Sequence, residues 1–325
     1  MKIIAVLLNP TIDQIYEIES FQVGGTFKVG KSIIYPVGKA ISFALGVREL
    51  SQAIDIIKII ACIGKDDIHI YSQFLKSRKI EFEFTIVEGK TRSNKTINDP
   101  IKRTTTHIRE VGFKLEDNEL KSLTDNVKST INVGDYVIFS GSIPLNVDEN
   151  IYYKMINICK EKGALTVLDT NGKALIKGIS ANPTIIKPNL IELSQILNKP
   201  ELNELNFSSS MENAIDSIIR EAKALLNQEL EIVLITLGNN GALLIMKDMV
   251  LYGNVNIENI IDTVGSGDSF LAGFVLNYFQ KKAIFDCFTC AIACGAANTL
   301  IQGPGIFKIE DVKKLIEKVE IIELS

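Results

Sequence analysis

Apolar runs of strand length alternate with helix-like segments along almost the entire chain. The candidate strands cover residues 3–8, 56–63, 136–139, 165–168, 184–186, 232–236 and 242–246. The candidate helices cover residues 41–50, 68–78, 117–131, 150–162, 191–197, 210–227, 267–280, 283–301 and 309–320. Strands that are apolar on both sides need cover on both faces, as in a parallel sheet between two helical layers. Because 46% of the 325 residues are hydrophobic, the chain can bury a core of this size. The pattern predicts an α/β fold with a mainly parallel central sheet.

Two stretches, residues 12–35 and 82–111, break this rhythm. In the second stretch Phe82, Phe84 and Ile86 alternate with polar neighbours. A period of two is typical of half-exposed strands. We therefore expect both stretches to form a small β-lid over one end of the sheet. The remaining ranges, 1–11, 36–81 and 112–325, are expected to form the α/β core.

The charge balance excludes some partners. A net charge of −4 gives no basic excess of the kind that nucleic-acid binding usually requires. The first apolar run ends at Asn9-Pro10, which is too short for a signal peptide. No stretch approaches the ~20 apolar residues of a membrane-spanning helix. We expect a cytoplasmic protein without a nucleic-acid or membrane partner.

Five cysteines in a chain of this length argue against a disulfide framework. Cys287, Cys290 and Cys294 lie on an apolar, alanine-rich segment, so we expect them to be small core residues. A metal or redox role for the CxxC pair is the alternative, although zinc usually takes four ligands.

A glycine turn within residues 261–273 is the most informative segment. Gly265, Ser266 and Gly267 precede an apolar helix, and Asp268 falls in its first turn. The N–H groups at a helix start lack partners, and glycine lets an anion approach them closely. Asp268 would then lie beside a bound phosphoryl group and accept a hydroxyl proton. The alternative is a plain turn in which Asp268 caps the helix. The Walker loop and the HRD and DFG motifs of protein kinases are absent.

The run Asp-Thr-Val-Gly-Ser-Gly-Asp that ends at Asp268 resembles the second signature of the ribokinase-like (PfkB) carbohydrate kinases. The resemblance implies a three-layer α/β/α sandwich whose core carries the nucleotide and whose β-lid covers the substrate. It implies that Asp268 is the catalytic base and that Gly265, Ser266 and Gly267 form an anion hole. It also implies ATP as phosphoryl donor, although ADP or another donor is an alternative.

The same resemblance extends to the nucleotide side of the site. The segment 186–193 resembles the family's KPNxxEL motif, which implies that Lys187 and Asn189 contact the nucleotide. Asn189 and Glu192 match the NxxE motif and would hold Mg²⁺ through water, since this ion keeps several waters. Further nucleotide-binding residues implied by the TLGxxGA loop and the alanine-rich helix are Thr236, Gly238, Gly241, Ala297 and Asn298. A capped helix and an ordinary turn are the alternatives.

On the acceptor side, the segment 9–13 resembles the NPxxD motif of the 1-phosphofructokinase and tagatose-6-phosphate kinase branch. The motif implies that Asp13 binds sugar hydroxyls. The segment 37–42 aligns with the family's GGKGxN, but only Gly38 and Lys39 match. Ser42 replaces an asparagine, so the sugar pocket is expected to be altered.

Further acceptor residues follow from the lid motifs. The segment 90–94 resembles TRxN, which implies that Arg92 grips a substrate phosphate and that Asn94 lies beside it. Lys28, and Ser140 in an SGSxP-like turn, complete the predicted acceptor site. Residues 104–110 depart from the pattern expected of 1-phosphofructokinases.

Together the motifs predict a kinase that phosphorylates a sugar phosphate, with fructose 1-phosphate first and tagatose 6-phosphate second. Ribose 1-phosphate, fructose 6-phosphate, an unphosphorylated sugar and a nucleoside are the alternative acceptors. A sugar-phosphate-binding protein without catalysis is the alternative class, because the 37–42 loop is altered. The resemblance also implies a homodimer formed through the lid.

Overall fold

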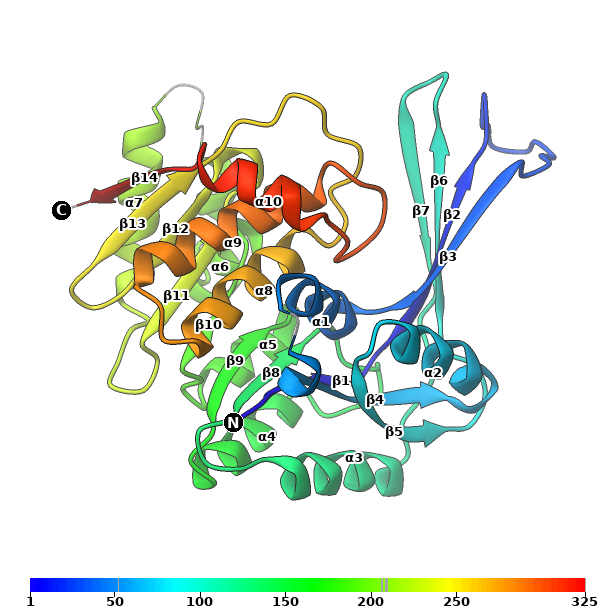
Figure 1. Ribbon diagram of the computed structural model, residues 1–325, viewed down its shortest axis with the longest axis horizontal. Helices are drawn as coiled ribbons and strands as arrows, with labels where there is room; N and C mark the ends of the chain where they lie inside the picture. The colour runs from blue at the N-terminus through cyan, green and yellow to red at the C-terminus, as the bar shows by residue number, and fades with distance from the viewer. Residues whose placement is uncertain (52, 206, 208–209, 325) are drawn as a thin grey trace.

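The computed structural model describes residues 1–51, 53–205, 207 and 210–324. Residues 52, 206, 208, 209 and 325 of the predicted core lie outside the described residues. The larger of two sheets contains ten strands (Figure 1). Their order is β14 (Glu320–Leu324), β13 (Val250–Asn254), β12 (Ala242–Ile245), β11 (Ile232–Thr236), β10 (Ile185–Ile186), β9 (Leu165–Asp169), β8 (Tyr136–Ser140), β1 (Ile3–Leu7), β4 (Ile57–Gly64) and β5 (Glu81–Val87).

The strands from β5 to β11 run parallel, whereas β12, β13 and β14 extend the sheet with antiparallel pairs. Alternate side chains of a strand enter two separate cores. In β1, Ile3, Ala5 and Leu7 enter one core, while Ile4 and Val6 enter the other. The sheet is therefore buried on both faces, as its continuous apolar runs predict.

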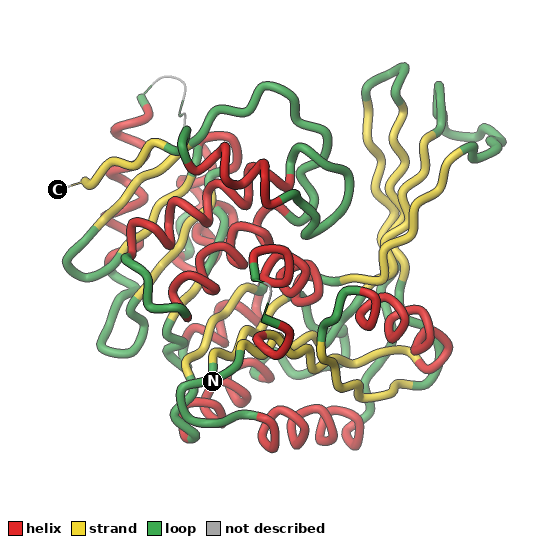
Figure 2. Tube along the Cα trace, in the orientation of Figure 1, coloured by secondary structure: helices red, strands yellow, loops and turns green. Residues whose placement is uncertain are grey.

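Helices cover both faces of this sheet (Figure 2). One core is formed with α1 (Lys39–Leu50), α2 (Ile68–Ser77), α8 (Ser266–Phe279) and α9 (Ile284–Asn298), and α10 (Ile309–Ile316) packs on α9. The opposite core is formed with α3 (Asp117–Thr130), α4 (Ile151–Glu161), α5 (Gly172–Ile179), α6 (Leu190–Leu197) and α7 (Met211–Lys223). This arrangement confirms the predicted three-layer α/β/α class.

The smaller sheet projects from the core beside α1 and α2 (Figure 1). Its four strands lie in the order β3 (Lys31–Val37), β2 (Thr11–Glu17), β6 (Ser93–Asp99) and β7 (Thr104–Arg109). The strands β2 and β6 pair in parallel, and the outer pairs are antiparallel. The Asp99 carboxylate joins two loops at the far end, because it accepts hydrogen bonds from the N–H groups of Ser20, Ile101 and Lys102 at 3.0–3.1 Å.

Strand β5 corrects one expectation. Residues 82–87 were expected in the lid, but β5 pairs in parallel with β4 at the edge of the large sheet. Phe82 and Phe84 are only partly buried and pack against the main core. Their alternation with polar residues therefore reflects an edge strand that is exposed on one side.

The C-terminal segment corrects another expectation. The helix expected over 309–320 ends at Ile316, and β14 follows as an edge strand. The helix α5 and the strand β13 were not expected from the sequence.

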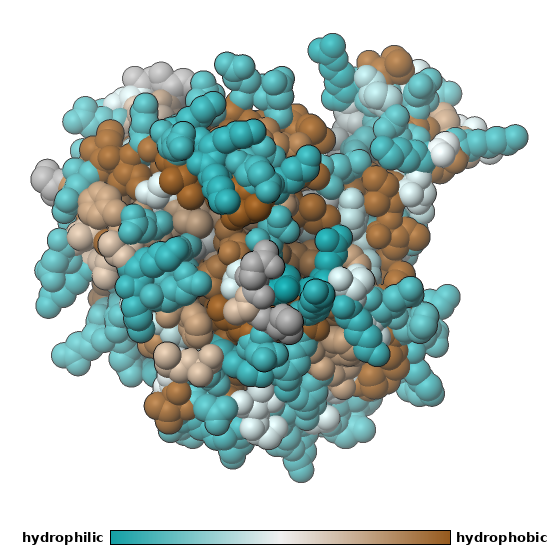
Figure 3. Space-filling view, in the orientation of Figure 1, coloured by the Kyte–Doolittle hydropathy of each residue, from teal (hydrophilic) through white to brown (hydrophobic). Residues whose placement is uncertain are grey.

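The surface carries both polar and apolar side chains. Figure 3 shows hydrophilic side chains interspersed with hydrophobic ones on one face of the molecule. Among the described residues, no helix combines the length and the apolar character needed to cross a membrane.

The predicted burial of the cysteines is confirmed. Cys287, Cys290 and Cys294 are buried as free thiols in the packing around α9.

Candidate active site

A cavity of about 780 Å³ lies where the carboxyl ends of the central strands meet the lid sheet. Ligands usually bind at this edge in open α/β sheets. Most of the predicted site residues line this one cavity: Asp13, Gly38, Lys39, Ser42, Arg92, Asn94, Lys187, Asn189, Glu192, Thr236, Gly238, Gly241, Gly265, Ser266, Gly267 and Asp268. Segments far apart in the sequence are thus brought to a single site.

The glycine turn starts helix α8. Gly265 is the N-cap residue and has a φ of 82°, a left-handed conformation that favours glycine. A side chain there would also come within 2.5 Å of the backbone nitrogen of Gly305. At Gly267, an added Cβ would lie 3.3 Å from the Nζ atom of Lys187. The turn therefore exposes helix N-terminal N–H groups beside a lysine charge, which is an arrangement suited to an anion.

Asp268 occupies the first turn of α8 and is only 6% exposed. Burial raises the pKa of Asp268 to about 7, and the charges of Lys39 and Lys187 oppose this rise. A carboxyl group with such a pKa is suited to accept a proton near neutral pH. Its place in the first turn also agrees with the capping alternative, but no side-chain hydrogen bond caps this helix.

Asp169, at the end of β9, holds two lysines of the site together. Its Oδ1 atom lies 2.7 Å from Nζ of Lys39 and 3.2 Å from Nζ of Lys187. The hydroxyl of Ser140 donates to Oδ2 at 3.3 Å. Burial works to raise the pKa of Asp169, but the two lysines hold it below its usual value. We name Lys39, Asp169 and Lys187 the carboxyl-edge cluster.

Asp169 was not among the predicted site residues. The sequence signal that indicates it is an aspartate directly after a buried strand, in the Asp-Thr-Asn-Gly run that ends at Gly172.

Asn189 and Glu192 form a reciprocal cap at the start of α6. The Asn189 side chain accepts from the Glu192 N–H at 2.8 Å, and Oε2 of Glu192 accepts from the Asn189 N–H at 2.9 Å. The backbone of Asn189 also forms an isolated parallel β-bridge with Thr236, which precedes the loop that contains Gly238 and Gly241. The capping alternative is thus present, and the same side chains line the cavity. Within the described residues, no group of three or more His, Cys, Asp or Glu side chains surrounds a common ion position.

The far end of the cavity is more apolar. Side chains that sequence reasoning missed line it here: Val255, Ile257, Ile260, Ile292, Ala296 and Thr299. Ala297 and Asn298 were expected at this end, but they are fully buried behind the lining. Asn298 instead accepts from the Ser269 hydroxyl and donates to the carbonyl groups of Gly303 and Ile306.

At the lid end, Asp13 is held by two neighbours. Its Oδ1 atom accepts from the Thr11 hydroxyl and the Asn94 amide, both at 3.0 Å. This leaves Oδ2 for hydroxyl groups in the cavity. Burial raises the pKa of Asp13, while these hydrogen bonds and the charges of Arg92 and Arg109 oppose the rise.

Ser42 lines the cavity from the first turns of α1 and is 2% exposed. Its N–H bonds the carbonyl group of Gly38 at 2.9 Å, as expected at a helix start. Gly38 itself has a φ of 137° and faces Leu7 so closely that a Cβ would be 2.9 Å away. The altered 37–42 loop thus keeps a glycine where the backbone requires one.

Two other predicted acceptor residues lie outside the cavity lining. Lys28 is exposed in the loop between β2 and β3. Ser140 is fully buried beneath the cavity floor, where it contacts Asp169. In contrast, Asn9, Ser142, Asn171 and Arg109 line the cavity although none of them was named as a site residue; Ser142 belongs to the same SGSxP-like turn as Ser140.

Comparison with known proteins identifies the family to which the chain belongs. The family model for pfkB family carbohydrate kinases matches residues 7–310. The chain therefore belongs to the PfkB family, whose members are phosphotransferases that act on a hydroxyl group.

Particular relatives span its whole length. The chain is 28% identical over 322 residues to a 1-phosphofructokinase of Bacillus subtilis, covering 99% of this chain and 100% of the relative. It is 27% identical over 330 residues to a tagatose-6-phosphate kinase of Staphylococcus epidermidis, again covering 99% and 100%.

Solved structures share the fold. Phosphofructokinase-2 from Escherichia coli in complex with potassium superposes with a TM-score of 0.86 at 21% identity, covering 97% of this chain and 98% of that one. A ribokinase from Thermotoga maritima superposes with a TM-score of 0.73 at 18% identity, covering 98% and 100%.

Proposed function

We propose that this carbohydrate kinase transfers the terminal phosphoryl group of ATP to a hydroxyl group of a sugar phosphate, with Asp268 as the base. The observation that carries the proposal is the meeting of Asp268, the Gly265–Gly267 turn and Lys187 at the middle of one cavity. A base in the first turn of α8, directly after an anion-binding turn, suits in-line phosphoryl transfer.

Each end of the cavity has a role in this proposal. The nucleotide lies along Lys187, Asn189 and the Thr236–Gly241 loop, with its base toward the apolar end. The acceptor lies toward the lid, where Oδ2 of Asp13 accepts from its hydroxyl groups. Asp268 then takes the proton of the reacting hydroxyl, and the N–H groups of the glycine turn hold the transferring group.

Magnesium fits the oxygen donors on the nucleotide side. Asn189 and Glu192 offer only a small set of oxygen atoms and already cap α6, so they would hold Mg²⁺ through its waters. Bound Mg²⁺ neutralises phosphate charge.

For the acceptor we favour fructose 1-phosphate and then tagatose 6-phosphate, since relatives of 28% and 27% identity bear those names. The arginines at the lid end support an anionic acceptor, which favours a phosphorylated sugar over a free sugar or a nucleoside.

We further propose that residues 12–35 and the hairpin of β6 and β7 act as a lid, and that it pairs two copies of the chain. Ile34 and Ile108 are each 50% exposed on the lid face opposite Asp13, where a second copy would cover them. Light scattering tests this pairing, because the mass of a single chain in solution would contradict it.

Free, buried cysteines suit a reducing compartment, so we place the reaction in the cytoplasm.

The test is a coupled kinase assay with ATP, Mg²⁺ and a panel of sugars and sugar phosphates. We expect turnover of one phosphosugar, and a loss of about 10²- to 10⁴-fold in kcat for Asp268→Asn, because the amide takes no proton. Sugar binding without turnover of any donor and acceptor pair would instead identify a binding protein.

A further inference from the structure

One row of four side chains crosses the lid sheet, and three of them line the cavity. In the strand register Tyr35 pairs with Asp13, Asp13 with Asn94, and Asn94 with Arg109. Paired residues of neighbouring strands point to the same face of a sheet. Because Asp13 and Asn94 line the cavity, the register brings Arg109 to the same face, and Arg109 indeed lines it.

The two arginines at this end differ in what they already bind. Nε of Arg92 donates to the carbonyl group of Pro10 at 3.1 Å, and its Nη2 donates to the carbonyl group of Asn9 at 3.2 Å. The Arg92 guanidinium is therefore largely used to hold β6 against the end of β1. For Arg109, the described part of the chain supplies neither a hydrogen bond nor an ion pair to the guanidinium. Arg109 keeps its full fork of donors for a ligand.

The charges nearby favour an anion at this position. The positive charges of both arginines act on Asp13, which is the one carboxylate in the row. Asp13 is already engaged by Thr11 and Asn94 and makes no ion pair with Arg109. The lid end thus has more positive than negative charge. A phosphate group supplies the missing negative charge and matches the planar fork of a guanidinium.

We propose that Arg109 is a specificity-determining residue that binds the phosphate group already present on the acceptor. This inference rests on the proposed sugar-phosphate kinase function and deepens it. Arg109 selects phosphorylated acceptors, while Arg92 positions the strand that carries Asn94. Residues 104–110, which depart from the expected pattern, are then the segment that supplies the phosphate contact.

The experiment compares the wild type with Arg109→Ala, Arg109→Lys and the control Arg220→Ala. Arg220 is an arginine of α7 that is 75% exposed and outside the cavity lining, so its removal changes the net charge equally. Acceptors are fructose 1-phosphate, fructose 6-phosphate and tagatose 6-phosphate, each measured beside the free sugar. Binding of each sugar phosphate without nucleotide is measured by calorimetry.

We expect Arg109→Ala to raise KM for the phosphorylated acceptor by about 10- to 100-fold, the effect of losing hydrogen bonds to a charged group. The rise in KM should exceed the fall in kcat, and KM for ATP should stay within about twofold, because the nucleotide lies at the other end. Arg109→Lys should lose less, since an ammonium restores the charge without the fork. Arg220→Ala should match the wild type.

The outcomes separate the two proposals. An active wild type whose KM is unchanged in Arg109→Ala overturns the role of Arg109 and leaves the kinase function intact. An equal loss for phosphorylated and free sugars also overturns it, because that pattern identifies a residue that only shapes the lid. A wild type that turns over no sugar phosphate refutes the proposed function. Calorimetry then still tests Arg109, since loss of sugar-phosphate binding in Arg109→Ala supports the phosphate contact and unchanged binding refutes it.

Discussion

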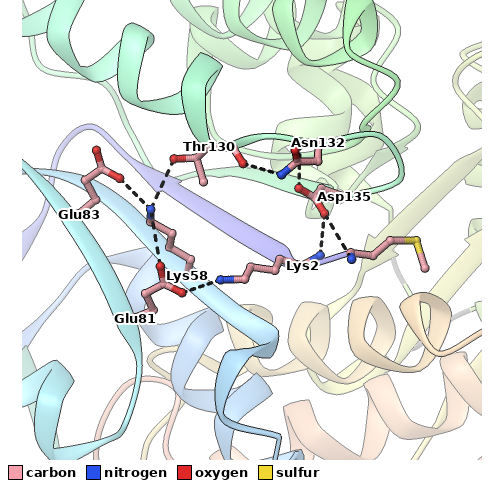
Figure 4. Close-up of polar contacts among 8 residues, drawn as sticks. Lys2, Lys58, Glu81, Glu83, Thr130, Asn132 and Asp135 are labelled. Atoms are coloured by element: carbon pink, nitrogen blue, oxygen red, sulfur yellow. Dashed lines mark hydrogen bonds and ion pairs between the residues drawn. The ribbon is translucent and has the colours of Figure 1, made fainter.

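Two groups of charged side chains lie at opposite ends of the strands of the large sheet, one at the carboxyl ends and one at the amino ends, and they differ in their exposure to water. The carboxyl-edge cluster contains a fully buried carboxylate between two lysines. The amino-edge cluster, which we define as Lys2, Lys58, Glu81 and Glu83 (Figure 4), has side chains that are 13–42% exposed. Both contain contacts of 2.7 Å, so distance alone does not distinguish them.

The amino-edge cluster joins three neighbouring strands. Lys2 lies just before β1 and contacts Glu81 of β5, while Lys58 of β4 contacts Glu83 at 2.7 Å and Glu81 at 3.7 Å. Glu81 and Glu83 are 42% and 36% exposed. Water screens such pairs, and exposed ion pairs typically contribute only about 0–1 kcal/mol. Charged side chains on an edge strand such as β5 also disfavour its pairing with other chains.

Asp135, a buried carboxylate near this cluster, binds backbone groups instead of lysines. Asp135 accepts from the backbone N–H groups of Lys2 at 2.7 Å and Asn132 at 2.9 Å (Figure 4). It fixes the start of β1 against the loop before β8.

The difference teaches that burial decides what an ion pair does. In the carboxyl-edge cluster, Asp169 and Lys187 have lost nearly all their water, whereas the Lys39 side chain is 35% exposed. Removing Asp169 therefore leaves the buried Lys187 charge without its partner. Such a cluster places two ammonium groups where the transferring phosphate is expected. The amino-edge cluster supports the sheet and leaves the chemistry untouched.

The largest expected effect tests this contrast directly. Asp169→Asn removes the shared partner of Lys39 and Lys187, and we expect it to lower the free energy of unfolding by about 3–5 kcal/mol. Urea denaturation followed by circular dichroism measures this change. Activity should fall as well, because both lysines lose their orientation. A loss below about 1 kcal/mol would place the cluster with ordinary surface pairs.

A second prediction concerns pH. As the proposed base, Asp268 would act only when deprotonated, and burial raises its pKa to about 7. We therefore expect kcat to fall about tenfold per pH unit below pH 7 and to level off above it. Asp169 stays charged through this range, since the lysines hold its pKa below the usual value. Circular dichroism at each pH confirms that the chain stays folded, and a flat profile between pH 5 and 8 would exclude Asp268 as the base.

The smallest effect is expected at the amino edge. Glu83→Gln should change the free energy of unfolding by about 0–1 kcal/mol and leave kcat unchanged, because the Glu83 side chain is 36% exposed and lies outside the cavity lining. The difference should shrink further in high salt. A loss as large as that of Asp169→Asn would mean that burial does not separate the two clusters.

Most of the fold was predictable because buried strands and amphipathic helices leave strong periodic signals. The strands β1, β4, β8, β9 and β11 fall within a residue or so of their predicted ranges. The placement of β5 was not predictable in this way, since the same alternation serves an edge strand and a lid strand. Only the pairing with β4 decides between them.

The candidate site was predictable where a motif keeps its residues in one short turn, as in Gly265–Asp268. Asp169 and Arg109 were missed for a different reason. Asp169 acquires its partners from segments far away in the sequence, and Arg109 faces the cavity only through its register with Asn94. Neither relation is recorded in local sequence.

The connectivity of the lid has a consequence for how the chain folds. The strands β2 and β6 pair in parallel, yet α1, β4, α2 and β5 lie between them in the sequence. Closing a loop of that size costs conformational entropy before the pairing returns any free energy. The core strands β1 and β4 therefore have to meet first and bring the two arms of the lid together. We expect the lid to assemble last during folding and to come apart first during unfolding, so that the acceptor end of the site is lost while the core is still intact.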